Sequence, residues 1–182
     1  MNRKSQIITL PNALTVSRVG LGLVMYWMLA TNPQNWAFWL IAMAIIGEIT
    51  DLADGYLARK FNMSSELGAA LDPLCDSLYR LAVFLGFAAA GWIPLWMILP
   101  FAFRDIIVSY VRINAASRGI SVGARWSGKI KAVVQGVVQI AILVLFALNI
   151  GEQWTIWLIW IAVLMTMYSL VDYVVGFTSN KT

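Results

Sequence analysis

The sequence from Asp51 to Asp76 reads DLADGYLARKFNMSSELGAALDPLCD and contains four aspartates at helical spacings. Asp51 and Asp54 stand three residues apart, and Asp72 and Asp76 stand four apart, so each pair lies on one face of its helix. The sequence around both pairs is strongly apolar. Carboxylates inside membrane-spanning helices are costly, so they mark candidate functional sites. A short connection, residues 59–67, joins the two helices, and antiparallel packing is therefore expected to bring the four carboxylates together.

The composition indicates a membrane protein. Of 182 residues, 60% are hydrophobic and 12% charged, against about 25% charged in soluble domains. Six spans of about 20 residues would use about 120 residues and leave only short loops. We therefore predict an all-α integral membrane protein with six transmembrane helices in a single domain, residues 1–182. The chain has no histidine and one cysteine, Cys75, which excludes histidine catalysis, histidine-bound zinc and intrachain disulfides.

The distribution of charge predicts the orientation. The expected spans cover residues 15–30, 37–58, 67–90, 95–116, 130–148 and 154–176, and the breaks at 31–36, 91–94 and 149–153 contain no Lys or Arg. All thirteen basic residues lie toward the other side, so both termini and the helix ends that carry the aspartates should face the cytoplasm. The net charge of +4 thus indicates a membrane face and no nucleic-acid partner. Residues 1–10 can form an interfacial helix that ends at Pro11.

Four carboxylates at close range need cations or protons to relieve their repulsion. Oxygen-only ligands suit Mg²⁺ or Mn²⁺, and four acids can hold two ions of the kind that assist displacement at phosphorus. The small residues Gly55, Ala58 and Gly68 would leave room for a phosphate or nucleotide. One alternative is that the acids are solvated and pair with Arg59, Lys60 and Arg80. Another is a divalent-cation transporter that uses the same carboxylates.

The spacing Asp51-x-x-Asp54-Gly55-x-x-Ala58-Arg59, eight residues, Gly68, three residues, Asp72, three residues, Asp76 resembles the signature of the CDP-alcohol phosphotransferase family. The resemblance implies six transmembrane helices, usually a homodimer, and transfer of a substituted phosphate from a CDP-linked donor to an alcohol with release of CMP. By the same resemblance Asp76 also takes the proton of the acceptor hydroxyl. The residues that would contact the donor are Asn12, Thr15, Asp54, Gly55, Ala58, Arg59 and Gly68.

Other segments resemble the branch of this family that uses CDP-diacylglycerol and glycerol 3-phosphate. They are residues 10–18, 104–109 and 128–131, with Arg112, Arg118 and Gln135. Two positions depart from that branch, which commonly has Glu at Asp105 and Lys at Ser77. Residues 109–112 also resemble the branch that uses inositol phosphate, which is the alternative acceptor.

Basic residues from the fourth span to the start of the fifth are expected to bind the acceptor phosphate, since guanidinium groups bind phosphate in a bidentate manner. They are Arg104, Arg112, Arg118, Lys129 and Lys131. Contact with anionic lipid headgroups is an alternative role for Arg118 and Arg125. Lys131, Gln135 and Gln139 form a polar stripe, which we expect to face a cavity instead of lipid. Glu48, one turn before Asp51, is expected to support the site or to be a neutral acid within the bundle.

Overall fold

The computed structural model describes residues 10–60, 66–117, 125–151 and 153–179, and every regular element in these ranges is helical. For residues 10, 11, 52, 54–60, 66–70, 116 and 179 only the backbone is described. The elements are α1 (Leu10–Thr31), α2 (Pro33–Lys60), α3 (Glu66–Ala89), a 3₁₀ helix η1 (Leu95–Ile98), α4 (Leu99–Ser117), α5 (Trp126–Ala147) and α6 (Gln153–Ser179). The all-helical prediction is thus confirmed for the described part of the chain.

Three of the described helices contain segments long and apolar enough to cross a membrane, namely residues 12–31, 126–147 and 153–178. The expected fourth span begins differently from the prediction, because its first four residues form η1 and α4 follows at Leu99. The expected interfacial helix over residues 1–10 falls almost wholly outside the described residues. Pro11 does not end a helix: it lies in the first turn of α1, where its missing N–H leaves no helical hydrogen bond unmade.

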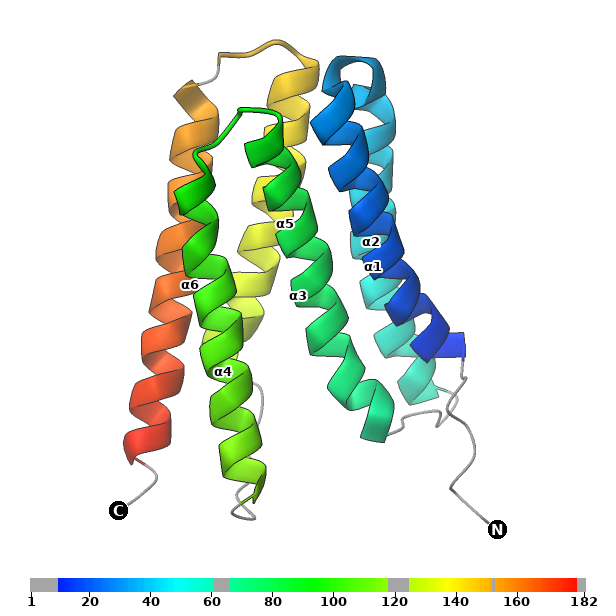
Figure 1. Cartoon of the computed structure of the whole chain (residues 1–182). Coiled ribbons are helices and arrows are strands. Elements are labelled where there is room, and N and C mark those ends of the chain that lie inside the picture. The colour runs from blue at the N-terminus through cyan, green and yellow to red at the C-terminus, as the bar shows by residue number, and fades with distance from the viewer. Residues whose placement is uncertain (1–9, 61–65, 118–124, 152, 180–182) are drawn as a thin grey trace. The chain divides into compact units, whose positions relative to one another are not determined.

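The chain forms two compact units, residues 1–90 and residues 91–182. In the first unit α1 packs along both α2 and α3 (Figure 1). Glycines allow α1 and α3 to approach closely: a Cβ atom on Gly22 would lie 3.1 Å from the Cα atom of Tyr79, and one on Gly86 would lie 3.3 Å from the Cα atom of Tyr26. Leu29 of α1 is fully buried and lies against Gly86 of α3.

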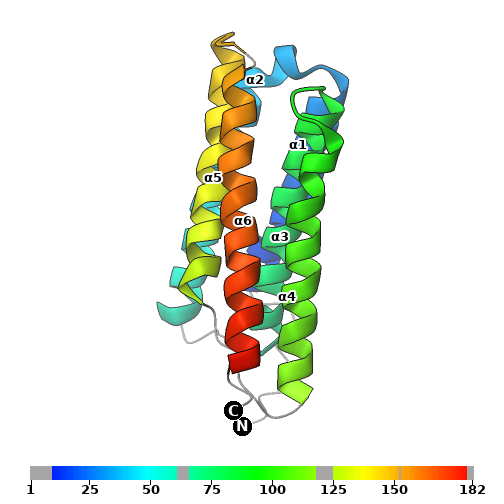
Figure 2. The same ribbon diagram turned by 90° about the vertical axis from the view of Figure 1, so that its left-hand side faces the viewer.

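In the second unit α6 packs against both α4 and α5, and Figure 2 shows it running alongside α5. The polar stripe of α5 is buried: Lys131, Gln135 and Gln139 are 5%, 1% and 2% exposed. The Nε2 atom of Gln135 donates a hydrogen bond of 2.9 Å to Thr166 Oγ1 on α6. This contact explains how a glutamine is accommodated in an otherwise apolar helix, because a buried amide is costly unless its hydrogen bonds are made.

Candidate active site

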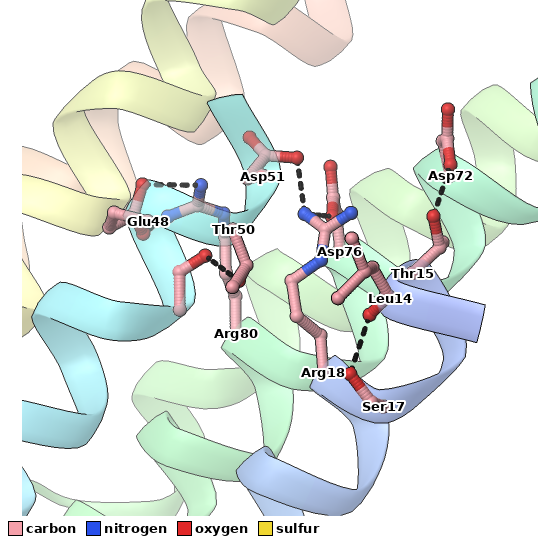
Figure 3. Close-up of polar contacts among 11 residues, drawn as sticks. Leu14, Thr15, Ser17, Arg18, Glu48, Thr50, Asp51, Asp72, Asp76 and Arg80 are labelled. Carbon is pink, nitrogen blue, oxygen red and sulfur yellow. Dashed lines mark hydrogen bonds and ion pairs between the residues drawn. The ribbon is translucent and has the colours of Figure 1, made fainter. Parts of the chain in front are cut away.

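Arg18 of α1 joins carboxylates from two other helices of the first unit (Figure 3). Its Nη1 atom donates to Asp51 Oδ1 on α2 and, at 2.5 Å, to Asp76 Oδ1 on α3. The side chain of Arg18 is 3% exposed, whereas those of Asp51 and Asp76 are 34% and 30% exposed. The two carboxylates therefore converge on one buried cation and keep part of their surface open.

A second residue of α1 contacts the third aspartate. Thr15 is 1% exposed, and its Oγ1 atom donates a hydrogen bond of 2.8 Å to Asp72 Oδ1 (Figure 3). Thr15 and Arg18 are three residues apart and so lie on one face of α1. The sequence predicted that antiparallel packing of α2 and α3 brings the four carboxylates together. In the structure α1 packs along both helices and supplies hydrogen-bond donors to Asp51, Asp72 and Asp76. For the fourth, Asp54, only the backbone on α2 is described.

Glu48 and Arg80 form an ion pair between α2 and α3. The Nη1 and Nη2 atoms of Arg80 donate to the two carboxylate oxygens of Glu48 at 2.9 and 3.3 Å (Figure 3). Glu48 precedes Asp51 by three residues and Arg80 follows Asp76 by four, so the pair lies one helical turn from both aspartates. Glu48 thus forms an ion pair with Arg80 beside the two aspartates.

The other predicted donor-binding residues are only partly described. Asn12 is buried, at 7% exposure, on the same helix as Thr15 and Arg18. Gly55, Ala58, Arg59 and Gly68 belong to the parts of α2 and α3 for which only the backbone is described. Two of the three partners that the solvated-acid alternative requires, Arg59 and Lys60, fall in the same group. The third, Arg80, forms an ion pair with Glu48.

A second polar cluster lies between the helices of the second unit. Arg104 of α4 is 8% exposed and donates through Nη1 to Asp105 and through Nη2 to Ser169 of α6, each at 2.9 Å. Lys131 of α5 donates to the same Asp105 oxygen at 3.0 Å. Among the described side chains of this cluster, two buried cations therefore share one carboxylate.

Tyr173 of α6 contacts both Arg104 and Arg112 of this cluster. Its side chain is 1% exposed, and the guanidinium carbons of Arg104 and Arg112 each lie 5.3 Å from its ring centroid. The Tyr173 hydroxyl accepts hydrogen bonds from Arg112 Nη2 at 2.7 Å and from the backbone N–H of Arg125 at 3.0 Å. Within the described structure the buried Nε atoms of Arg104 and Arg112 have no hydrogen-bond partner. The cluster thus has unused donors as well as excess positive charge, both of which suit an anion.

Three of the five predicted phosphate-binding residues, Arg104, Arg112 and Lys131, belong to this cluster. Lys129 is exposed, and its Nζ atom lies 5.0 Å from the ring centroid of Trp126. Arg118 lies outside the described residues.

The sequence did not predict the contribution of α6, namely Ser169, Asp172 and Tyr173. Asp172 accepts hydrogen bonds from Arg125 Nε at 2.8 Å and from Ser127 Oγ at 2.5 Å. Arg125, for which headgroup contact was the alternative role, is therefore ion-paired with Asp172 in this cluster. The usable signal was Asp172 itself, an acid within a predicted span.

The donor set of the first unit suits a hard divalent cation, because carboxylate and hydroxyl oxygens are the ligands that Mg²⁺ and Mn²⁺ prefer. Asp51 and Asp76 already place one oxygen each against a single cationic nitrogen. Among side chains that the structure describes, no three acids or thiols gather as a metal site. Arg18 lies between two of the expected ligands, and a third, Asp54, is not described at the side-chain level.

The described residues form a helical protein with three helices long and apolar enough to cross a membrane, and two of its aspartates converge on one buried arginine. Residues 8–168 match the sequence profile of the CDP-alcohol phosphatidyltransferase family, so the chain belongs to that family. The resemblance drawn from the aspartate spacing is thereby confirmed, and so is the enzyme class. The transporter alternative is set aside.

Three relatives show the range of names among similar proteins. The Mycobacterium tuberculosis protein named "Putative cardiolipin synthase" is 34% identical over 119 residues, which are 65% of this chain and 56% of that relative, so the match spans little more than half of its length. The "Probable phosphatidylglycerophosphate synthase" of the same organism is 32% identical over 176 residues, 94% of this chain and 82% of the relative. The "CDP-diacylglycerol--glycerol-3-phosphate 3-phosphatidyltransferase" of Escherichia coli K12 is 32% identical over 171 residues, 90% of this chain and 92% of the relative.

Proposed function

We propose that the chain transfers the phosphatidyl group of CDP-diacylglycerol to sn-glycerol 3-phosphate, giving phosphatidylglycerophosphate and CMP. Family membership supports the donor chemistry, and the Escherichia coli relative that bears this activity in its name covers nine-tenths of the chain. The observation that carries the proposal is the convergence of Asp51 and Asp76, from two helices, on one cation. This arrangement brings together two of the acids of the family signature.

The proposal includes a membrane topology. The whole chain, residues 1–182, would be one catalytic domain with six spans, both termini in the cytoplasm of an inner-membrane protein, and a homodimer as the assembly. The three strongly apolar helices and the placement of all thirteen basic residues on one side support this arrangement. Protease accessibility of tags at the two termini in sealed inverted vesicles tests the orientation.

Asp51, Asp54, Asp72 and Asp76 would hold two Mg²⁺ or Mn²⁺ ions. Such ions neutralise the pyrophosphate of the donor and the charge that develops on departing CMP. The CDP group would lie against the same helices, lined by Asn12, Thr15, Gly55, Ala58, Arg59 and Gly68. Small side chains at three of these positions leave the backbone accessible to a nucleotide or phosphate.

Asp76 would act as the general base. The acceptor oxygen forms a bond to the phosphorus of the phosphatidyl group, the bond from that phosphorus to the CMP oxygen breaks, and CMP leaves with the electron pair. The proton of the acceptor hydroxyl passes to the carboxylate of Asp76. A carboxylate base needs hydrogen-bond reach to that hydroxyl, and the 30% exposure of the Asp76 side chain leaves it accessible.

Arg104, Arg112 and Lys131 would bind the phosphate of the acceptor, with Lys129 and Arg118 as further contributors. Arg104 and Lys131 share the single carboxylate of Asp105, and the guanidinium Nε donors of Arg104 and Arg112 have no partner within the described structure. A phosphate dianion would supply the missing acceptors and compensate the charge. The cluster therefore favours a phosphorylated acceptor over a neutral alcohol.

The test is CMP release from purified protein in mixed micelles with CDP-diacylglycerol and Mg²⁺. Glycerol 3-phosphate, inositol phosphate and phosphatidylglycerol are offered in turn, the last because one relative is named as a cardiolipin synthase. We expect release with glycerol 3-phosphate, with the lipid product identified by its mass. Release with only one of the other acceptors would replace the proposed acceptor, and no release with any would refute the proposed reaction.

Two variants separate the roles within this reaction. Asp76→Asn should abolish turnover while the protein still elutes as a folded species in gel filtration; near-normal turnover would refute its role as the base. Arg112→Ala should raise the KM for glycerol 3-phosphate by about tenfold, roughly 1.4 kcal/mol of binding. The KM for CDP-diacylglycerol is the internal control, because Arg112 is assigned only to the acceptor.

A further inference from the structure

We infer that Arg18 is a built-in counter-cation that holds the metal-binding carboxylates together in the metal-free protein and competes with divalent cations for them. This inference rests on the proposed metal site and concerns a residue to which that proposal gives no role. Its basis is the position of one Arg18 nitrogen against an oxygen of Asp51 and an oxygen of Asp76. The guanidinium thus occupies the place where a metal ion would meet the same two oxygens.

Burial gives this contact its significance. The Arg18 side chain is 3% exposed, so its charge is compensated by the protein and not by water. The side chains of Asp51 and Asp76 are 34% and 30% exposed, which leaves a side from which a cation can approach. Arginine therefore closes the inner side of the carboxylate pair, and the outer side stays accessible.

Competition follows from charge and from hydrogen bonding. Without a cation, two facing carboxylates would repel each other strongly in these surroundings, and Arg18 removes that repulsion. A divalent ion that takes the same oxygens must weaken at least one Arg18 hydrogen bond and then lies close to a positive charge. The wild-type protein should consequently bind metal more weakly than a variant without this charge, although Arg18 helps to assemble the site.

If Arg18 only stabilised the fold, its replacement would weaken metal binding or leave it unchanged. The direction of the change in metal affinity therefore decides between the two roles. The first measurement is Mn²⁺ binding to the full-length protein in detergent, followed by the electron paramagnetic resonance signal of free Mn²⁺, without lipid substrate. We expect Arg18→Gln to lower the Kd for Mn²⁺ by about tenfold or more, because a unit charge within a few ångströms is removed. An unchanged or higher Kd would overturn the inference.

Arg104→Gln is the matched control. Like Arg18, Arg104 is a buried arginine that pairs with an aspartate. It belongs to the second unit, in the cluster that is proposed to bind the acceptor phosphate. The Kd of this variant for Mn²⁺ should equal that of the wild type. A similar tightening in both variants would show that net charge, and not the position of Arg18, governs metal affinity, and would also refute the inference.

Thermal unfolding gives a second readout that does not depend on activity. In EDTA, Arg18→Gln should unfold at a lower temperature than the wild type, because the carboxylates have lost their counter-charge. Added Mn²⁺ should raise its Tm by more than it raises that of the wild type. The double variant Arg18→Gln/Asp51→Asn should recover stability in EDTA, since one of the repelling charges is gone; no recovery would contradict the counter-cation role.

Two further variants keep the outcomes distinct. Asp76→Asn in the wild-type background should weaken Mn²⁺ binding; if it does not, the proposed metal site itself is wrong. If it does, but Arg18→Gln fails to tighten binding, only the present inference is wrong. Should Arg18→Gln not fold, Arg18→Met decides, because its unbranched side chain keeps most of the packing of the arginine stem and also removes the charge. Its Kd should then fall severalfold, and a Kd equal to the wild-type value would overturn the inference.

Discussion

Tyr173→Phe is the perturbation for which the structure gives the most detailed expectation. The change removes one hydroxyl and keeps the ring, so the contacts of the Arg104 and Arg112 guanidinium groups with the ring at 5.3 Å should persist. Two hydrogen bonds are lost, from Arg112 Nη2 at 2.7 Å and from the backbone N–H of Arg125 at 3.0 Å. The variant therefore isolates the positioning role of the hydroxyl from the packing role of the ring.

The two lost bonds set the magnitude. A hydrogen bond to a charged group contributes about 1.5–3 kcal/mol and a neutral one about 0.5–1.5 kcal/mol. Since Tyr173 is 1% exposed, little water is available to replace its oxygen, and we expect a total loss of about 2–4 kcal/mol in the free energy of unfolding. Arg112 also loses the contact that fixes its orientation. We expect the KM for the phosphorylated acceptor to rise by about tenfold while kcat changes by about twofold or less.

The assay compares KM and kcat for glycerol 3-phosphate with the KM for CDP-diacylglycerol, together with thermal unfolding. Tyr168→Phe is the control, because Tyr168 lies on the same helix and is 62% exposed. It should leave stability and both KM values unchanged. If Tyr173→Phe likewise left the acceptor KM unchanged, Tyr173 would not position the phosphate-binding residues. A fall in kcat with no change in KM would contradict the positioning role as well.

Two other predictions concern the first unit. Arg80→Met and Glu48→Gln should each lower the free energy of unfolding by about 1–3 kcal/mol, less than the roughly 3–5 kcal/mol of a fully buried pair, because the carboxylate is partly exposed. In the double variant the loss of unfolding free energy should be less than the sum of the two single losses. An additive loss, measured by chemical denaturation, would exclude coupling between the two residues. Gly22→Leu should cost at least about 1–3 kcal/mol, because it forces a side chain against the backbone of α3, whereas Gly20→Leu on the same helix meets open space within 4 Å of its Cβ position. Equal Tm values for the two leucine variants would disprove the close packing of α1 and α3.

Helix positions were predictable because apolar length carries that information. The six expected spans coincide with α1 to α6 to within about five residues at most ends, and the basic-free breaks fall at the turns after α1, after α3 and after α5. The ends were less predictable where local geometry decides them. The sequence predicted that a preceding helix ends at Pro11, but Pro11 lies in the first turn of α1. It also predicted that an α-helix begins at Leu95, where the structure has a 3₁₀ helix.

The aspartates were predictable from sequence, but their partners were not. Spacing along one helix shows which residues share a face, so the acids of α2 and α3 could be grouped. It does not show which other helix lies against that face. No contact between Arg18 and the aspartates was predicted from the sequence, because its contacts with Asp51 and Asp76 depend on how α1 packs against their helices. The contribution of Tyr173 could not be predicted for the same reason, because the donors to its hydroxyl come from other parts of the chain.

The ion pairs that the structure describes around the aspartates share one property: each joins two different helices. Arg18 of α1 pairs with acids of α2 and α3, and Arg80 of α3 pairs with Glu48 of α2. In a bilayer, lipid tails are as apolar as leucine side chains, so burial of apolar surface does not decide which face of a helix turns inward. Polar contacts between helices can, because only one rotation of each helix satisfies them. The charges that form the proposed active site would thus also fix the rotation of the helices that carry it, which explains why stabilising partners are found one turn away from the aspartates themselves.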